Sequence, residues 1–320
     1  MAKSRRLEAT LEEVKAIARL ETIGASEIES LRKIIRGKQP IAIAPTTKII
    51  IRHSLTQLIP DMPAAFERML HNGGDTDPNC KAKWAIANTL YQLEKPNADL
   101  FLAGIRHIQP EPVLGKTIDT APPLRSLCAL GLVQANYSKV LEELADLLAD
   151  PEHDARAGAA RAVGYSQNPA GIPLLRLKVR VGDAEPQVMS ECFIALLKLS
   201  GEQAPMVLKA LENGSAAVQE LAAIALAEAR IPEAFAAIKR QWQRTRDTDL
   251  RGSFLLSIAT LQNEESITFL TDQLERGNLA DAKDALIALD IYRNTTDIWH
   301  RIIRVVDLRE NSELISILNR

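Results

Sequence analysis

The residues best suited to metal or thiol chemistry are few in this sequence, and they lie far apart. The histidines and cysteines are His53, His71, His107, His153, His300, Cys80, Cys128 and Cys192. A zinc or iron site needs such side chains clustered with one another or with carboxylates, and the sequence contains no C-x-x-C motif and no His-Glu dipeptide. We therefore expect no metal site and no bound cofactor. Three scattered cysteines are typical of reduced thiols in a cytoplasmic protein.

Three other chemical motifs begin in the sequence and are not completed. Asp75-Thr76-Asp77-Pro78-Asn79 is similar to the start of a calcium loop, but Cys80 stands where the loop needs glycine and Ile86 where it needs glutamate. Ser166 follows Gly164-Tyr165 as in a nucleophile elbow, but the closing glycine is missing and no strand is expected before it. No phosphate-binding loop and no dinucleotide fingerprint occurs. The sequence therefore favours a protein without catalytic residues.

Cations recur at one position, directly after the first residue of a repeated pattern described below. They are Lys83, Arg125, Arg156 and Arg251. In stacked repeats they could form a ladder along one face, and we predict that these four side chains contact a partner protein. The alternative is that each forms a salt bridge within its repeat, with an aspartate of the preceding turn such as Asp154 or Asp249.

A second basic feature surrounds one tryptophan. Its residues are Lys239, Arg240, Trp242, Arg244 and Arg246. Cations beside an aromatic ring suit contact with phosphate or nucleic acid. The alternative is a solvated helix end, where cations are favoured by the helix dipole.

A repeat organises the chain from residue 82 onward. An anchor residue is followed seven positions later by a small residue and eight positions later by an aliphatic one. The anchors are Ala82, Leu124, Ala155, Val188, Val218, Leu250 and Asp281, of which only the last is not apolar. The small residues are Thr89, Gly131, Ala162, Ala195, Ala225, Ser257 and Ala288. The aliphatic residues are Leu90, Leu132, Val163, Leu196, Leu226, Ile258 and Leu289.

The repeat predicts pairs of helices. Positions 0, 4, 7 and 8 share one helix face, and a small residue there lets a neighbouring helix approach closely. A unit of about 31 residues holds two helices of roughly 12–13 residues and two turns. Turn signals such as Asp150-Pro151 and Asn213-Gly214 fall between the predicted helices, and 140–148 and 267–274 are amphipathic first helices. We predict an all-α chain with no sheet.

The segment 150–164, DPEHDARAGAARAVG, resembles the signature of HEAT repeats, and residues 77–309 follow the same pattern. It is most similar to the subgroup first noticed in phycobilisome lyases. The resemblance implies a right-handed α-solenoid whose concave face is lined by the second helix of each unit. Deoxyhypusine hydroxylase is similar in length and fold but holds its irons with His-Glu pairs, which this chain lacks. DNA glycosylases of the alkylation-repair kind are similar in architecture alone.

Two parts of the chain depart from the repeat. Residues 1–73 are predicted to form an N-terminal cap, with helices at 7–19 and 26–36, a loop from Gly37 to Thr47, and a further repeat at 47–72 with Ser54 in the small column. The array then covers 74–320. Its insertion at 109–123 contains four prolines and cannot form a regular helix. This insertion is either a long inter-repeat loop or a ligand-contacting loop.

Composition bounds the function. The formal net charge is -2, with 39 basic and 41 acidic residues, which argues against a general nucleic-acid binder. No apolar run suits a signal peptide or a membrane helix, so we expect a cytoplasmic protein. We predict a non-catalytic interaction or scaffold protein that binds another protein on its concave face. The alternatives are a bilin lyase or chromophore-handling factor, implied by the repeat subgroup, and a nucleic-acid binder using residues 239–246.

Overall fold

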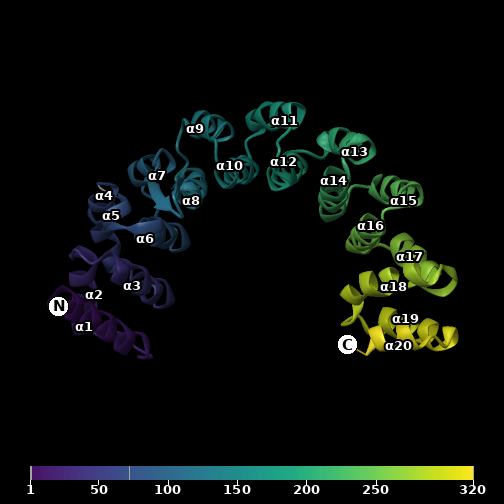
Figure 1. Ribbon diagram of the computed structural model, residues 1–320, viewed down its shortest axis with the longest axis horizontal. Coiled ribbons are helices and arrows are strands. Elements are labelled where there is room, and N and C mark those ends of the chain that lie inside the picture. Colours follow the sequence, from purple (N-terminus) through teal and green to yellow (C-terminus); the bar gives the residue numbers. More distant parts are fainter. Residues whose placement is uncertain (1, 72, 320) are drawn as a thin grey trace. The chain divides into compact units, whose positions relative to one another are not determined.

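Paired helices make up nearly all of the structure, a computed structural model that describes residues 2–71 and 73–319. The chain forms two compact units, Met1–Leu174 and Leu175–Arg320. Figure 1 shows in each unit a layer of first helices and a layer of second helices. The predicted all-α, HEAT-like architecture of helix pairs is confirmed in both units. The boundary predicted at residue 73, between a cap and an array, stays a prediction.

Over its described residues, unit 1 contains ten α-helices, a two-stranded hairpin and the start of an eleventh helix, which continues into unit 2. The helices are α1 (Ala2–Ala18), α2 (Ala25–Arg36), α3 (Pro40–Arg52), α4 (Met62–Leu70), α5 (Gly73–Thr76), α6 (Lys81–Gln92), α7 (Ala98–Ile105), α8 (Pro122–Gln134), α9 (Val140–Leu147), α10 (His153–Tyr165) and α11 (Ile172–Val181). The strands are β1 (Pro110–Val113) and β2 (Lys116–Asp119). The short 3-10 helices are Thr56–Asp61, Pro78–Cys80 and Pro169–Gly171.

Unit 2 repeats the same pairing. Its helices after α11 are α12 (Pro186–Leu199), α13 (Ala204–Asn213), α14 (Ala216–Glu228), α15 (Ala234–Arg244), α16 (Thr248–Thr260), α17 (Glu264–Arg276), α18 (Leu279–Leu289), α19 (Thr296–Arg309) and α20 (Ser312–Leu318), with 3-10 turns at Gly201–Gln203 and Asp290–Tyr292. The second helices α12, α14, α16 and α18 pack side by side in order. Along its described residues, no helix of either unit is long and apolar enough to cross a membrane.

Short polar residues start several helices, and left-handed residues end them. Asn97, Ser215 and Asn263 each accept a hydrogen bond from a backbone N–H in the first turn of the helix that follows. Glu94 and Gln262 follow helix ends with φ of 53° and 54°. A left-handed residue there reverses the chain and lets its N–H reach the last free carbonyls of the helix. Residues adjacent in the sequence therefore fix where these helices begin and end.

The small column is buried where a second helix meets a neighbouring helix, as predicted. Ala162, Ala195 and Ala225 are at most 2% exposed. A Cβ atom placed on Gly131 would lie 2.5 Å from the ring of Phe101 on α7. Small side chains at this position therefore set how closely neighbouring helices approach.

Two predictions for the N-terminal segment are wrong. Residues 40–47 are the start of α3 and not a loop, because Pro40 occupies the first turn, where no backbone N–H is needed, and Pro45 costs one bond close to that end. The burial of Ile43 and Ile50 against the core compensates for that bond. Ser54 lies beyond the end of α3 with φ of 51°, so it is not a residue of the small column.

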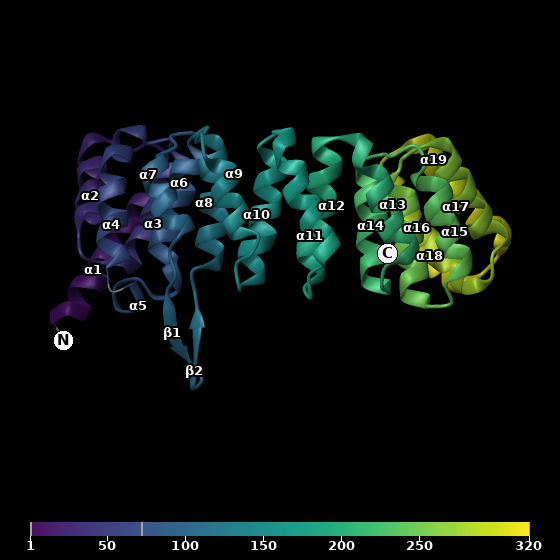
Figure 2. The same ribbon diagram turned by 90° about the horizontal axis from the view of Figure 1, so that it is seen from above.

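The proline-rich insertion forms a β-hairpin, so the prediction of a chain with no sheet is also wrong. β1 and β2 pair antiparallel, with Val113 opposite Lys116 and Glu111 opposite Ile118. Leu114 and Gly115 form the turn with φ of 49° and 80°. Positive φ at both turn residues gives the twist that a two-residue hairpin needs. Figure 2 shows the hairpin projecting beyond the ends of the helices of unit 1.

Candidate functional site

The four cations predicted to bind a partner share one structural role. Each side chain donates a hydrogen bond to a carbonyl at or just beyond the end of the preceding first helix. The pairs are Lys83 with Met69, Arg125 with His107, Arg156 with Asp150 and Arg251 with Trp242. The last carbonyls of a helix lack partners within it and carry partial negative charge. These cations therefore join the two helices of their own unit.

Lys83 and Arg125 do not present their charge at the surface. They are 0% and 2% exposed. Arg125 lies between two carboxylates, with Nη1 2.6 Å from Asp119 and Nη2 3.0 Å from Asp150. A buried cation paired in this way stabilises the joint between helices instead of offering charge to a partner. Asp119, at the end of β2, lies six residues before Arg125 as the salt-bridge alternative expected, whereas the sequence did not indicate the contact with Asp150, which comes from the next unit.

Arg251 is held in the same way, and its partner explains the one irregular anchor of the repeat. Nη2 of Arg251 lies 2.7 Å from Oδ1 of Asp281, the anchor of the next unit. Its guanidinium also stacks over the ring of Trp242 at 4.2 Å. The alternative of a salt bridge to an aspartate of the preceding turn holds for Lys83 with Asp77 and for Arg125 with Asp119. The examples named for it, Asp154 and Asp249, are not the partners, since Arg125 also pairs with Asp150 and Arg251 pairs with Asp281. Partner contact through Arg156 and Arg251 stays a prediction.

The basic segment 239–246 is divided among several environments. Lys239 lies over the rings of Phe235 and Phe269, and Arg240 forms an ion pair of 3.4 Å with Glu212. Trp242 is 7% exposed, so its faces are covered by protein. Arg244 and Arg246 are exposed. A base could not stack on Trp242 in this arrangement, and contact with phosphate stays a prediction.

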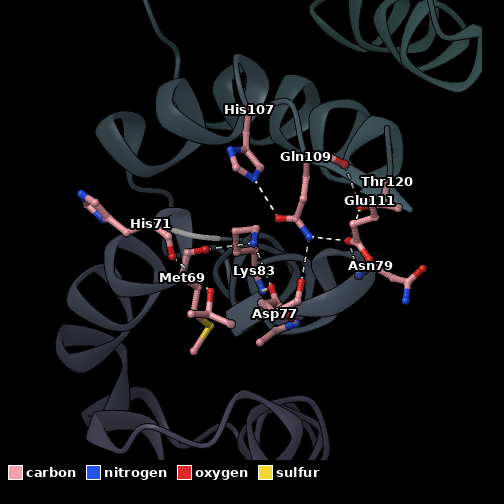
Figure 3. Close-up of polar contacts among 11 residues, drawn as sticks. Met69, His71, Asp77, Asn79, Lys83, His107, Gln109, Glu111 and Thr120 are labelled. Carbon is pink, nitrogen blue, oxygen red and sulfur yellow. Dashed lines mark hydrogen bonds and ion pairs between the residues drawn. The ribbon is translucent and has the colours of Figure 1, made fainter. Parts of the chain in front are cut away.

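A buried polar network fixes the hairpin to the helices of unit 1 (Figure 3). Nζ of Lys83 lies 3.3 Å from Asp77, and the amide of Gln109 donates to the Asp77 carbonyl at 2.9 Å and to Glu111 at 2.6 Å. Thr120 donates to the same Glu111 oxygen at 2.6 Å. Burial would raise the pKa of Glu111, but these hydrogen bonds and the one from the Asn79 N–H together lower it. The hairpin base is therefore anchored by an ionised glutamate.

The network also holds a strained backbone. Asn79 and Cys80 are consecutive residues with φ of 58° and 53°, a conformation that costs free energy outside glycine. The Asp77 carboxylate accepts from the N–H groups of Ala82 and Lys83 at the start of α6. Burial raises the pKa of the Cys80 thiol to about 11, so it stays protonated at neutral pH and is a poor nucleophile.

The part of the chain that the structure describes contains no candidate metal site. No three histidine, cysteine, aspartate or glutamate side chains there are grouped to hold an ion. Asp77 of the incomplete calcium motif is instead 2% exposed, and its carboxylate caps α6. An aspartate at position 77 is therefore explained by its role in capping α6.

A groove opens beside this network on the second-helix layer of unit 1. It has a volume of about 520 Å³ and is bordered by residues of α3, α6 and α8. Trp84, which is 40% exposed, contributes its ring. Lys48 and Lys81, both exposed, also line the groove. The sequence pattern did not reveal this groove, because its residues come from three separate helices.

The second-helix layer of unit 2 presents an exposed aliphatic row that the sequence analysis missed. Ile194, Ile224, Leu256 and Ile287 occupy the sixth position after the anchor in four consecutive units. Leu256 and Ile287 are 47% and 56% exposed, and the other two are partly exposed. The sequence contains a signal for this row. A helix position that faces away from the core is expected to be polar, but here it is aliphatic in four consecutive units.

Carboxylates flank this row. Glu220, Glu228, Asp249 and Asp284 lie on the same helices and are at least partly exposed. Burial, and then the nearby carboxylates of Asp281 and Asp249, raise the pKa of Asp284 above its ordinary range, against the effect of Arg251. Burial is the largest cause of this rise, and the two neighbouring carboxylates add to it.

The comparisons with known proteins concern the fold alone. No protein-family model matches the chain, and no curated protein matches it in sequence. The chain is similar to the CpcE and CpcF complex of phycocyanin lyase from Nostoc sp. PCC7120, with 18% identity over 79% of this chain and 94% of that one, and a TM-score of 0.40. It is also similar to human deoxyhypusine hydroxylase, with 17% identity over 90% of this chain and 98% of that one, and a TM-score of 0.32. At these TM-scores the likenesses add nothing to the assignment of function.

Proposed function

We propose that this protein is a non-catalytic scaffold that binds a segment of another protein along the second-helix layer of unit 2. The observation that carries the proposal is the aliphatic row Ile194, Ile224, Leu256 and Ile287 at equivalent positions of four neighbouring helices. One exposed aliphatic side chain is ordinary on a protein surface, but a contiguous row with a polar rim is typical of an interaction site.

The chemistry of the rim defines the partner. Glu220, Glu228 and Asp284 lie on helices of the row, as do Lys198 and Lys283. A partner segment that carries both apolar and basic residues could contact the row and these carboxylates together. An amphipathic helix fits such a surface, with its apolar side on the row and its lysines or arginines toward the carboxylates. Fully burying one leucine or isoleucine side chain contributes about 1.5–3 kcal/mol, so half-exposed residues in a row supply a substantial part of a micromolar affinity.

A synthetic probe tests this surface directly. A fluorescein-labelled amphipathic helix of leucine and lysine should bind the wild-type protein, and its binding should weaken as salt increases. Leu256→Glu should weaken binding by about tenfold or more, because it places a charge in the row. The measurement is fluorescence polarisation, with the leucine–glutamate version of the probe as the charge control.

A matched variant separates the row from general surface apolarity. Leu177 on α11 is 62% exposed and lies in the first-helix layer. Leu177→Glu should leave probe binding unchanged. In affinity capture from native lysate, a true partner should be lost with Leu256→Glu and retained with Leu177→Glu. Equal binding by both variants would contradict the proposal.

A further inference from the structure

We infer that the groove between α3, α6 and α8 of unit 1 is a binding site for a small molecule with a flat apolar body and a negatively charged group. This site is separate from the surface of the proposed function and lies in the other unit. Its volume, about 520 Å³, falls in the range of small-molecule sites, which are concave, mostly apolar and carry a few polar groups.

The apolar part of the groove is suited to a ring. The indole of Trp84 is 40% exposed although it lies on the inner helix α6, where its neighbours Ala85 and Ile86 are buried. Ala44 and Ile51 of α3 lie on one side of the groove and Leu124 of α8 on the other. A planar ligand stacked on the indole would remove this surface from water, and stacking adds to the burial of area.

The polar groups of the groove select a negative charge. Lys48 on α3 and Lys81 on α6 are exposed, and neither has an ion-pair partner in residues 2–71 and 73–319. The amide of Asn88 also lines the groove, and within the described chain it has no hydrogen-bond partner. Two uncompensated cations and one amide donor beside an apolar floor match a ligand that joins a ring to a carboxylate, sulfonate or phosphate.

The start of α6 is not itself the anion site. The N–H groups of Ala82 and Lys83 already donate to the carboxylate of Asp77, at 2.8 and 2.9 Å. The attraction for a negative group therefore comes from the lysine side chains, which substitutions can remove without disturbing the helix cap.

The wall of the groove is rigid. Asn79, Cys80 and Thr120 line it, and Glu111 accepts from the Asn79 N–H at 2.7 Å and from the Thr120 hydroxyl at 2.6 Å. A wall held by buried hydrogen bonds loses little freedom when a ligand binds, which favours affinity. The protonated Cys80 thiol makes this a site of binding without covalent attachment.

Two fluorescent probes with nearly the same aromatic body test the inference. They are 8-anilinonaphthalene-1-sulfonate, which carries a negative charge, and N-phenyl-1-naphthylamine, which carries none. The wild-type protein should bind one equivalent of the sulfonate with energy transfer from Trp84, and more tightly than the neutral probe. Trp84→Ala should abolish that transfer and weaken binding about tenfold, and Trp84→Phe should retain part of the affinity.

Charge reversal separates the lysines from the apolar floor. Lys48→Glu with Lys81→Glu should weaken the sulfonate about tenfold or more and change the neutral probe by less than about twofold. Glutamate is favourable in the first turn of α6, so the second change is compatible with folding. The matched control is Lys116→Glu with Lys139→Glu, which changes the net charge equally at exposed positions outside the groove. Circular dichroism and thermal unfolding verify that each variant is folded.

Three outcomes would overturn the inference. The first is sulfonate binding that is equal in wild type and in folded Trp84→Ala. The second is an equal loss in the two double charge reversals. The third is binding of an acidic peptide at the groove with no binding of either probe, which would make it a protein contact. None of these outcomes bears on the leucine–lysine probe, so failure of this inference and failure of the proposed function are distinguishable.

Discussion

Arg251 and Asp281 lie thirty residues apart in the chain, and their side chains are joined by two hydrogen bonds of 2.7 and 3.1 Å. The same guanidinium donates to the carbonyls of Trp242 and Thr245 at the end of α15. One side chain therefore closes its own helix pair and fixes the next one. This contact replaces the apolar anchor that the other units use.

Breaking this pair should destabilise the protein. Arg251→Met and Asp281→Asn should each lower the free energy of unfolding by about 2 kcal/mol, because each leaves a poorly solvated charge or hydrogen-bonding group without its partner. The double variant should cost less than the sum of the two. Urea unfolding measures all three. Arg240→Met is the control, since the Arg240–Glu212 pair is exposed and should contribute less than about 1 kcal/mol. Additive effects of the two single changes would contradict direct coupling.

Two glycines in equivalent helices should respond oppositely to the same substitution. Gly131→Ala should lower the free energy of unfolding by about 1–3 kcal/mol, because the new Cβ would meet the Phe101 ring at 2.5 Å. Gly252→Ala should raise it by about 0.5–1 kcal/mol, since its Cβ would meet only the Asp284 carboxylate at 3.6 Å. Thermal and urea unfolding of both variants provide the comparison. A stabilising Gly131→Ala would show that the α7–α8 contact is looser than described.

The small column predicts that overpacking on α12 of unit 2 destabilises the protein. Ala195 on α12 is 2% exposed, and Ala195→Leu should cost about 1–3 kcal/mol by overpacking. Stability in a repeat array is roughly a sum of unit and neighbour contributions, so unfolding should also broaden. Glu212→Leu, at an exposed position of α13, should cost much less. Urea unfolding of the two variants and of wild type measures this difference. An Ala195→Leu variant as stable as wild type would show that the assigned register is wrong.

Asp284 should make stability depend on pH in a defined direction. Because burial raises its pKa in the folded state, the folded protein binds this proton more tightly than the unfolded chain does. Its stabilising contribution is complete below the ordinary value of 3.8 and is lost as pH rises through the raised value. Asp284→Asn should therefore raise the melting temperature at neutral pH. The difference from wild type should shrink as pH falls toward the ordinary value. A variant less stable than wild type at neutral pH would contradict this assignment.

The sequence by itself determined the helix pairs and their register. The small and aliphatic columns recur because each second helix must bury one face and admit a neighbour, and that requirement is local and periodic. For this reason the sequence alone places Ala195 and Leu196 in the core. The same periodicity also indicates the exposed row at Leu256 and Ile287, which lies on the helix face opposite the buried one.

The tertiary structure decided what the charged residues do. Lys83 and Arg125 follow their anchors as Arg251 does, yet they are buried. Asp77 and Asp119 pair with them from six residues upstream, and Asp150 reaches Arg125 from the next unit. Likewise α3 tolerates Pro45 because core packing outweighs one lost hydrogen bond. The groove beside Trp84 exists only where three helices and the hairpin base meet. Contacts of this kind depend on which loops fold together, and no local pattern of residue types contains that information.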